Sequence, residues 1–384
     1  MMLEIKPFKA TIYNKKISSD SVIAPPYDVI DKEKREQLFA RSKYNITHII
    51  LPEGKNKYEC ARGLLREWIH KNILLKEDTP ALFIYEQVFN WEGKQKILKG
   101  FVGALELEEW GRNVYPHEKT LSGPKIDRFN LITQTKTFFS PILALYEDDK
   151  EIEQIFSLYD KRNPDICACY EQNVHKIWKI TEKENIDIVC SAMRKKKAII
   201  ADGHHRYETA LNIKKAYPHA GCNNIPVMFM GMKKSGLLLL PIHRLIEKTD
   251  ENFLKRLSQY FNIEESIKKD GEIVMYDGKN YYNLNTKIKR NELLPIFFDH
   301  IIYRKILRLS EEDMKKQQNV GYAHSTAEAI KAIDGKKAKY AFLLKAISYK
   351  ELTDVVKKGV ILPQKSTFFY PKVLSGLIMH TFGD

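Results

Sequence analysis

The chain has 384 residues, enough for one large or two medium domains that each bury a hydrophobic core. Apolar residues make up 43% and charged residues 29%, which excludes a disordered protein, and no apolar run reaches the length of a membrane span. The net charge of +14 fits nucleic acid, nucleotides or phosphorylated metabolites as partners. The five cysteines form no C-x-x-C pair and the N-terminal segment lacks a signal-peptide core, so we expect a cytoplasmic protein without membrane contact.

The first third of the chain predicts a turn, two helices and a hairpin. The run Pro25-Pro26-Tyr27-Asp28 predicts a rigid turn before a helix that begins near Lys32, and Asp28 either caps that helix or takes part in catalysis. Apolar residues at helical spacing predict a second helix within 60–75. The segments 81–89 and 97–107 flank a turn and predict a β-hairpin of two long strands.

The segment 114–128 is dense in charge, glycine and proline. Loops of this kind between regular elements often carry function, although an ordinary solvated loop is the alternative. The candidate side chains for substrate binding or catalysis in this segment are His117, Glu118, Lys119, Lys125 and Arg128.

The middle of the chain predicts further strands at 138–146, 175–180 and 226–232. The last of these is followed by the turn KKSG and the apolar run 236–246, which together predict a second hairpin. His243 and Arg244 close that run, where they are either a ligand contact or a structural pair.

A change of character near Glu247 predicts a domain boundary, because amphipathic helical stretches and lysine-rich segments follow it. We expect a nucleotide-binding or catalytic domain over 1–246 and a C-terminal α/β region over 247–384. Strands and helices are interleaved but two hairpins are predicted, so the expected class is α+β (mixed α/β) rather than a purely parallel sheet.

The stretch 195–217 gives the most specific local prediction, a strand, a tight turn and a helix. Residues 198–201 are short and apolar, Asp202 and Gly203 supply an N-cap side chain and a flexible turn, and apolar residues then recur on one helical face up to Tyr217. Backbone N–H groups and the positive end of the helix dipole would meet at this turn, which favours an anion such as phosphate.

Arg206 lies on the flank of the apolar stripe in the first helical turn, so it needs an anionic partner. His204 and His205 are adjacent and cannot bind one metal ion from the same helical face. The alternative for this stretch is structural: Asp202 caps the helix, Arg206 pairs with an internal carboxylate, and the histidines lie at the surface.

No Walker P-loop, dinucleotide-binding glycine motif or kinase catalytic loop occurs in the sequence. Polar clusters remain, and they contain the cations and carboxylates that phosphoryl transfer needs around phosphates, metal and acceptor hydroxyl. Lys365 and Lys372 flank the segment STFFYP, which favours a core-filling strand with lysines reaching to solvent over a surface that stacks bases.

Six ordered blocks resemble one bacterial and archaeal family, domain of unknown function 1015: IAPPYDVI, ALFIYEQVF, PHEKTLSGPKIDR, IADGHHRYETAL, LPIHRLI and PQKSTFFYPKVLSGL. Within them, DGHHRY resembles the nucleotide-phosphate motif of the ParB and sulfiredoxin superfamily, which includes free-serine kinases and CTP-using partition proteins. The resemblance implies a ParB/sulfiredoxin-like nucleotide-binding core with insertions and a C-terminal α/β extension.

The resemblance also implies roles for individual residues. Gly203, His204, His205 and Arg206 would contact nucleotide phosphates, and Asp202 would position a metal ion or the acceptor. The general base is expected to be Glu118, with Asp28 as the second choice.

We therefore expect a nucleotide-dependent phosphotransferase that uses ATP or ADP with Mg²⁺ and acts on a hydroxyl of a small polar metabolite, with free serine as the example. One alternative is a ParB-like regulatory module that binds nucleotide without transfer and contacts DNA or protein; no concentrated basic stripe favours nucleic acid. Another is a metal-dependent phosphohydrolase that uses His117, His204, His205, Asp202 and His243. The sequence does not specify the oligomeric state.

Overall fold

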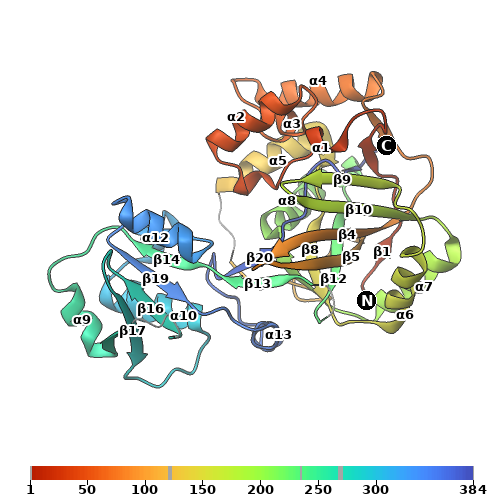
Figure 1. Ribbon diagram of the computed structural model, residues 1–384. Helices are drawn as coiled ribbons and strands as arrows, with labels where there is room; N and C mark the ends of the chain where they lie inside the picture. The colour runs from red at the N-terminus through yellow and green to blue at the C-terminus, as the bar shows by residue number, and fades with distance from the viewer. Residues whose placement is uncertain (1, 120–122, 234–235, 267–270, 384) are drawn as a thin grey trace. The chain divides into compact units, whose positions relative to one another are not determined.

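Figure 1 shows the computed structural model of the chain, which describes residues 2–119, 123–233, 236–266 and 271–383. The chain folds into two compact units that alternate along the sequence. Unit 1 comprises Met1–Pro116, Ser122–Leu237 and Pro371–Asp384, and unit 2 comprises His117–Leu121 and Leu238–Tyr370. The boundary near Glu247 stays a prediction. In the described part of the chain, no helix is long and apolar enough to cross a membrane.

Unit 1 is built on a mixed sheet that, within the described residues, has the strand order β6-β11-β8-β12-β5-β4-β10-β9, with β1 also paired to β5. β11 runs parallel to β6 and β12 runs parallel to β8, whereas the other neighbours are antiparallel. The strands of this sheet are β1 (Ile5–Lys6), β4 (Leu82–Trp91), β5 (Lys94–Glu106), β6 (Val114–Tyr115), β8 (Ile142–Tyr146), β9 (Ile166–Tyr170), β10 (Asn173–Ile180), β11 (Ala198–Asp202) and β12 (Asn224–Gly231).

Helices complete unit 1, and α5 contacts both α4 and α8. Figure 1 shows α2, α3, α4 and α5 grouped at the top of this unit. The helices are α1 (Ser19–Val22), α2 (Lys32–Arg41), α3 (Thr47–Ile50), α4 (Lys57–His70), α5 (Gly123–Thr135), α6 (Lys150–Tyr159), α7 (Lys183–Arg194) and α8 (His204–Ala216), with the 3₁₀ turns η1 (Tyr27–Val29) and η2 (Pro218–Ala220). Short strand pairs are β2 (Thr11–Tyr13) with β3 (Leu74–Lys76), and β7 (Thr137–Phe138) with β21 (His380–Thr381).

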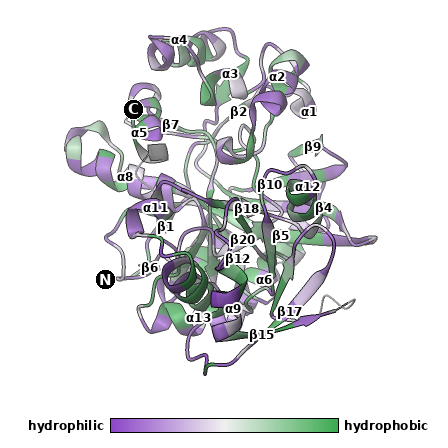
Figure 2. Ribbon diagram, turned by 90° about the vertical axis from the view of Figure 1, so that its left-hand side faces the viewer, coloured by the Kyte–Doolittle hydropathy of each residue, from purple (hydrophilic) through white to green (hydrophobic). Residues whose placement is uncertain are grey.

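Amphipathic spacing explains why these helices form and which face they bury. α4 buries Ala61, Leu65 and Trp68, which recur about one turn apart, and Figure 2 shows hydrophobic and hydrophilic residues side by side along it. α8 buries Tyr207, Ala210, Leu211 and Ile213 of the predicted stripe in the core of the sheet, as expected. Tyr217, the last residue of that stripe, is instead 47% exposed and lies beyond the end of the helix.

The start of α2 settles one alternative for Asp28. The side chain of Asp31 accepts the N–H of Lys34, and so Asp31 caps the helix that begins at Lys32. The interpretation of Asp28 as the cap of this helix is therefore wrong, and Asp28 is exposed in η1.

Unit 2 is built on an antiparallel sheet with the order β15-β17-β16-β19-β14-β18, and β13 pairs separately with β20. Two apolar clusters surround these strands. The strands are β13 (Leu238–Pro241), β14 (His243–Ile246), β15 (Phe261–Glu265), β16 (Ile273–Tyr276), β17 (Tyr281–Thr286), β18 (Val320–Ala323), β19 (Tyr340–Leu344) and β20 (Thr367–Tyr370). The helices are α9 (Phe253–Tyr260), α10 (Leu294–Phe298), the π-helix η3 (Asp299–Ile306), α11 (Glu311–Lys315), α12 (Thr326–Asp334) and α13 (Tyr349–Lys357).

The observed class is α+β, as expected, and one of the two predicted hairpins is confirmed. β4 and β5 pair along their length, with Trp91 opposite Lys94 at the tip. The second predicted hairpin is wrong, because β12 pairs with β5 and β8, whereas β13 pairs with β20 and β14 with β18 and β19. A short apolar run indicates a buried strand without indicating its partner, and 236–246 is in fact two short strands.

Candidate functional site

β11, the turn after it and α8 form the expected strand, turn and helix, but the residue at the N-cap of the helix is not the predicted one. Gly203 occupies the N-cap position of α8 in the left-handed conformation, with φ of +95°, and no side chain caps the helix. The prediction that Asp202 caps α8 is therefore wrong. A Cβ at position 203 would lie 2.6 Å from Cγ2 of Ile142 and 2.9 Å from Nη2 of Arg206, so both the backbone conformation and the neighbours require glycine.

Asp202 forms ion pairs with two cations of unit 1. Its Oδ2 accepts a hydrogen bond from Nη2 of Arg206 at 2.9 Å, and its Oδ1 accepts one from Nζ of Lys372. Burial opposes the charged form, but Lys372 and Arg206 outweigh it and hold the pKa of the Asp202 carboxyl well below its usual range. Asp202 is therefore a carboxylate at neutral pH, and it is the internal partner that Arg206 needs.

Arg206 is 8% exposed and is fixed by several acceptors. Besides the ion pair, its Nη1 donates to Oγ of Ser140 at 2.8 Å and to the carbonyl of Pro141 at 2.9 Å. The guanidinium is thus held between the start of α8 and the residues before β8. Such fixed charge-assisted bonds orient a donor group without further ordering cost.

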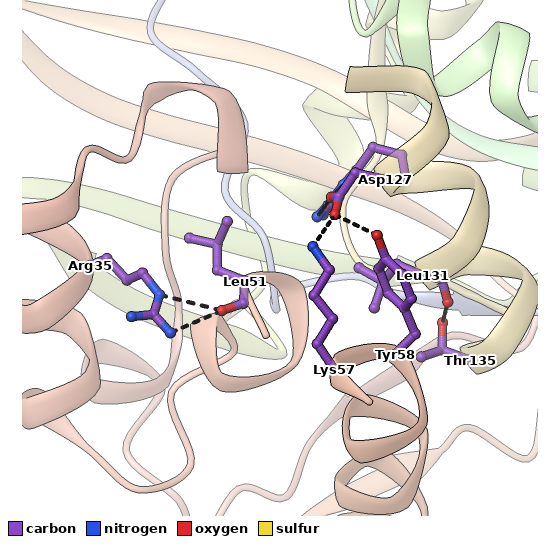
Figure 3. A network of polar contacts seen from close by, with 8 residues as sticks. Arg35, Leu51, Lys57, Tyr58, Asp127, Leu131 and Thr135 are labelled. Carbon is purple, nitrogen blue, oxygen red and sulfur yellow. Dashed lines mark hydrogen bonds and ion pairs between the residues drawn. The ribbon is translucent and has the colours of Figure 1, made fainter. Parts of the chain in front are cut away.

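A second arginine, Arg128 of α5, stacks with its guanidinium 4.2 Å from the ring centre of Tyr27. Its Nε donates to Oδ2 of Asp127 at 3.0 Å. Figure 3 shows how Oδ1 of Asp127 in turn accepts bonds from Nζ of Lys57 at 2.9 Å and from the hydroxyl of Tyr58 at 2.8 Å. Asp127 therefore joins α5 to α4 and orients Arg128.

Arg128 and Arg206 line the same small cavity, of about 30 Å³. Its polar lining also includes Tyr27, Ser140 and Ser375, and apolar side chains of α3, of α5 and of the segment 138–139 complete it. Burial raises the pKa of Tyr27 to about 12, so its hydroxyl stays protonated beside the two arginines. A cavity with two guanidinium groups and hydroxyl donors, close to the start of α8, has the chemistry of an oxyanion site.

The chain matches the family described as "Protein of unknown function (DUF1015)" over residues 5–308. The protein belongs to the DUF1015 family. No curated protein matches the sequence.

Solved structures with a distant likeness to this DUF1015 protein share little sequence with it. A conserved hypothetical protein from Pyrococcus furiosus has 16% identity and a TM-score of 0.38, with 68% of this chain and 90% of that chain covered. A free serine kinase in complex with AMP has 13% identity and a TM-score of 0.41, with 72% and 98% covered. SbnI with a C-terminal truncation, from Staphylococcus aureus, has 13% identity and a TM-score of 0.39, with 72% and 86% covered.

The remaining predicted residues of the DUF1015 chain belong either to unit 1 or to unit 2. His204 is buried, with its ring 6.5 Å from that of Trp110, so the interpretation of both histidines as surface residues does not hold for it, and His205 is partly buried. His117, Glu118, Lys119, His243 and Arg244 belong to unit 2, whereas Asp28, Arg128 and the 202–206 turn belong to unit 1. Lys125 lies in α5, but its side chain is outside the described residues.

Within unit 2, Glu118 accepts the backbone N–H groups of Lys365 at 2.8 Å and of Ser366 at 3.1 Å, one on each carboxylate oxygen. Burial raises the pKa of Glu118. His243 accepts the N–H of Leu344 on Nδ1 at 3.1 Å. Both side chains therefore stabilise the backbone around them, and Lys119 is exposed.

The sequence does not reveal two side chains that bind Asp202 or Arg206, namely Lys372 and Ser140. The expectation that Lys372 reaches to solvent beside a terminal strand is wrong, because its ammonium group pairs with Asp202. Ser140 precedes β8 and shows no sequence signal. Over the described ranges, no group of three or more His, Cys, Asp or Glu side chains is arranged to hold a metal ion.

The Asp127 network gives a pH-dependent prediction. Burial works against the charged form, but Arg128, Lys57 and Tyr58 together lower the pKa of Asp127 to about 2. A lowered folded-state pKa adds stability above the unfolded value of about 3.9, and this stability is lost as the pH falls towards 2. Because Asp127 is 35% exposed, we expect Asp127→Asn to cost only about 1 kcal/mol at pH 7.

Urea denaturation of both proteins at several pH values measures this. The difference in unfolding free energy should shrink between pH 5 and pH 2. Glu67→Gln, which removes an exposed pair with Lys71 on α4, is the control and should change stability by a few tenths of a kcal/mol at each pH. A constant cost of Asp127→Asn down to pH 2 would contradict the prediction.

Proposed function

We propose that this protein is a nucleotide-dependent phosphotransferase that takes a phosphoryl group from ATP or ADP to a hydroxyl of a small polar metabolite, such as free serine. The observation that carries the proposal is the cavity where the fixed guanidinium groups of Arg128 and Arg206 meet beside the start of α8. The resemblance of DGHHRY to a nucleotide-phosphate motif supports the same position.

In this proposal, the nucleotide phosphates lie against Arg206, Arg128 and the first N–H groups of α8. Donors already fixed in place stabilise negative charge on the transferring group without reorganisation. Gly203 lets Ile142 and Arg206 lie close to the backbone of the turn, since it carries no Cβ. The phosphates compete with Asp202 for Arg206 and Lys372, so binding would shift these two cations from the carboxylate to the ligand.

Asp28 is better supported than Glu118 as the base that takes the proton of the acceptor hydroxyl. Asp28 is exposed and follows Tyr27, which lines the cavity, whereas each oxygen of Glu118 already accepts a backbone N–H. The acceptor oxygen attacks the terminal phosphorus as its proton passes to the carboxylate, and the bond to the bridging oxygen breaks. The products are the phosphorylated metabolite and a nucleotide with one phosphate fewer.

Mg²⁺ stays a prediction. Both oxygens of Asp202 accept bonds from cations, so the arrangement does not fit a metal ion on this residue. By accepting from both cations, the carboxylate of Asp202 instead fixes the positions of Arg206 and Lys372.

The test is calorimetric titration of ATP, ADP, CTP and GTP, with Mg²⁺ in the buffer, into wild type, Arg206→Ala and Arg128→Ala. One nucleotide should bind the wild type, and each variant should lose at least tenfold in affinity, because a bond to a charged group contributes about 1.5–3 kcal/mol. Arg194→Ala, which removes a half-exposed arginine at the end of α7, should bind normally. Circular dichroism confirms that the variants are folded.

Transfer of labelled phosphate to serine and to other hydroxylated metabolites then tests the reaction. Binding without any transfer would support the regulatory nucleotide-binding module instead. No binding by any nucleotide, or full affinity in Arg206→Ala, would rule out the cavity as the phosphate site.

A further inference from the structure

A cavity of unit 1 other than the proposed phosphate cavity lies between the N-terminal segment, the edge strand β9 and the C-terminal segment that returns to this unit. α1 packs beside β9 there (Figure 1). The cavity has a volume of about 240 Å³. This is slightly below the range of about 300–1,000 Å³ for the pockets of drug-sized ligands, so the cavity suits a smaller molecule.

Backbone hydrogen bonds hold the floor of this cavity in place. Ile23, which lines it, is fully buried. The backbones of Ala24 and Ser375 exchange two hydrogen bonds, of 3.2 and 2.7 Å. The N–H of Gly376, the next residue, donates to the carbonyl of Phe139 at 2.9 Å. Ser375 lines the proposed phosphate cavity and Gly376 lines this one, so the same backbone separates the two cavities.

Opposite charges line the cavity from two different parts of unit 1. Lys15 follows β2, and Asp165 precedes β9. Oδ2 of Asp165 accepts the backbone N–H of Lys179 at 2.8 Å, which fixes the carboxylate in place. Both Lys15 and Asp165 are exposed. The ammonium group of Lys15 and Oδ1 of Asp165 are therefore available to a ligand.

Neighbouring charged residues lie outside the lining of the cavity. Asp20 accepts the backbone N–H of Cys169 at 2.6 Å. The ammonium group of Lys179 lies 2.7 Å from a carboxylate oxygen of Glu77. The lining therefore offers a ligand one cation and one carboxylate.

Two charges of opposite sign select a ligand that also carries both. A cation alone would meet the ammonium group of Lys15, and an anion alone would meet the carboxylate of Asp165, whereas a zwitterion pairs with both. We propose that this cavity binds a free α-amino acid with an apolar side chain. Its carboxylate pairs with Lys15 and accepts from the hydroxyl of Ser19, and its ammonium group donates to Oδ1 of Asp165. Its side chain lies against Ile23 and Leu377, which are apolar residues of the lining.

Alkylation of Cys167 in the full chain tests the proposal, because this exposed thiol lines the cavity. L-Leucine should slow the reaction of Cys167 with iodoacetamide, followed by peptide mass spectrometry, and should leave the reaction of the exposed Cys60 in α4 unchanged. Isocaproate and isoamylamine keep the apolar part of leucine but lack its ammonium group and its carboxylate, respectively. Each should need an at least about fivefold higher concentration for the same protection, because one charged contact is lost.

Variants that remove one charge assign the two halves of the ligand. Lys15→Gln and Asp165→Asn should each weaken the protection by leucine about fivefold. Lys15→Gln should not weaken the protection by isoamylamine, and Asp165→Asn should not weaken that by isocaproate. Asparagine still offers an oxygen to the N–H of Lys179, so Asp165→Asn should keep the wild-type melting temperature. Lys16→Gln, which removes the neighbouring exposed lysine, is the control and should be protected as the wild type is.

Equal protection by leucine and both analogues would show an apolar groove without charge selection and would overturn the proposal. No protection of Cys167, equal protection of Cys60, or unchanged protection in both charge variants would overturn it as well. The proposal does not depend on nucleotide binding. Arg206→Ala should keep the protection by leucine, so this site and the proposed phosphate cavity can fail separately.

Discussion

Asp202→Asn is expected to lower the free energy of unfolding by about 3 kcal/mol at pH 7. The carboxylate compensates both Arg206 and Lys372, which are mostly buried, and an amide would leave two cations close together without a counter-charge. Breaking a buried ion pair on one side costs more than the pair itself contributes, because the remaining charge stays desolvated. Chemical denaturation of the two proteins measures the difference.

The pH dependence of this difference follows from the direction of the pKa shift. The pKa of Asp202 is lowered in the folded protein, so its contribution is present above the unfolded value of about 3.9 and is lost as the pH falls below it. Asp160→Asn, which removes a half-exposed carboxylate that pairs with Lys99, is the control and should cost less than about 1 kcal/mol. A cost for Asp202→Asn no larger than the control would contradict the buried-pair interpretation.

Gly203→Ala is expected to destabilise the protein by about 3 kcal/mol. A residue other than glycine pays about 1–2 kcal/mol for the left-handed conformation, and the new Cβ would press against the side chain of Ile142, with a typical overpacking cost of 1–3 kcal/mol. Relief of the clash would move either β8 or Arg206, so the variant should also alter the cavity.

Gly54→Ala provides a matched control for the backbone term. Gly54 has φ of +92°, close to the +95° of Gly203, but an added Cβ there meets no atom within 4 Å. We expect Gly54→Ala to cost about 1 kcal/mol, so the excess in Gly203→Ala measures the clash alone. Equal costs in thermal and chemical denaturation would show that the close approach to Ile142 is unimportant.

Local chemistry made part of the candidate site predictable. The strand, the glycine turn and the helix over 198–216 follow from short-range patterns, as does the requirement that Arg206 meet an anion. The ion pair of Arg206 with Asp202 can also be predicted from the sequence, because the two residues are four positions apart, a spacing at which opposite charges meet across a turn.

Long-range pairing was not predictable. Lys372 meets Asp202 across 170 positions of sequence, and Ser140 meets Arg206 across 66. Such contacts depend on strand order, which apolar runs do not encode, and the same ambiguity produced the wrong hairpin over 226–246. The position of Glu118 in a charged loop predicts a catalytic role. Its carboxylate instead accepts the backbone N–H groups of Lys365 and Ser366, which lie far away in the sequence.

Because the chain is synthesised from its N-terminus, the ion pairs of the turn after β11 are completed late. Asp202 and Arg206 leave the ribosome long before Lys372, and β21, the partner strand of β7, follows later still. Unit 2 is translated in between, because Pro371–Asp384 returns to unit 1. A nascent chain that has not yet reached Lys372 therefore has an Asp202 with only one of its two cations, and the mature charge balance around Arg206 arises only once that lysine has been added.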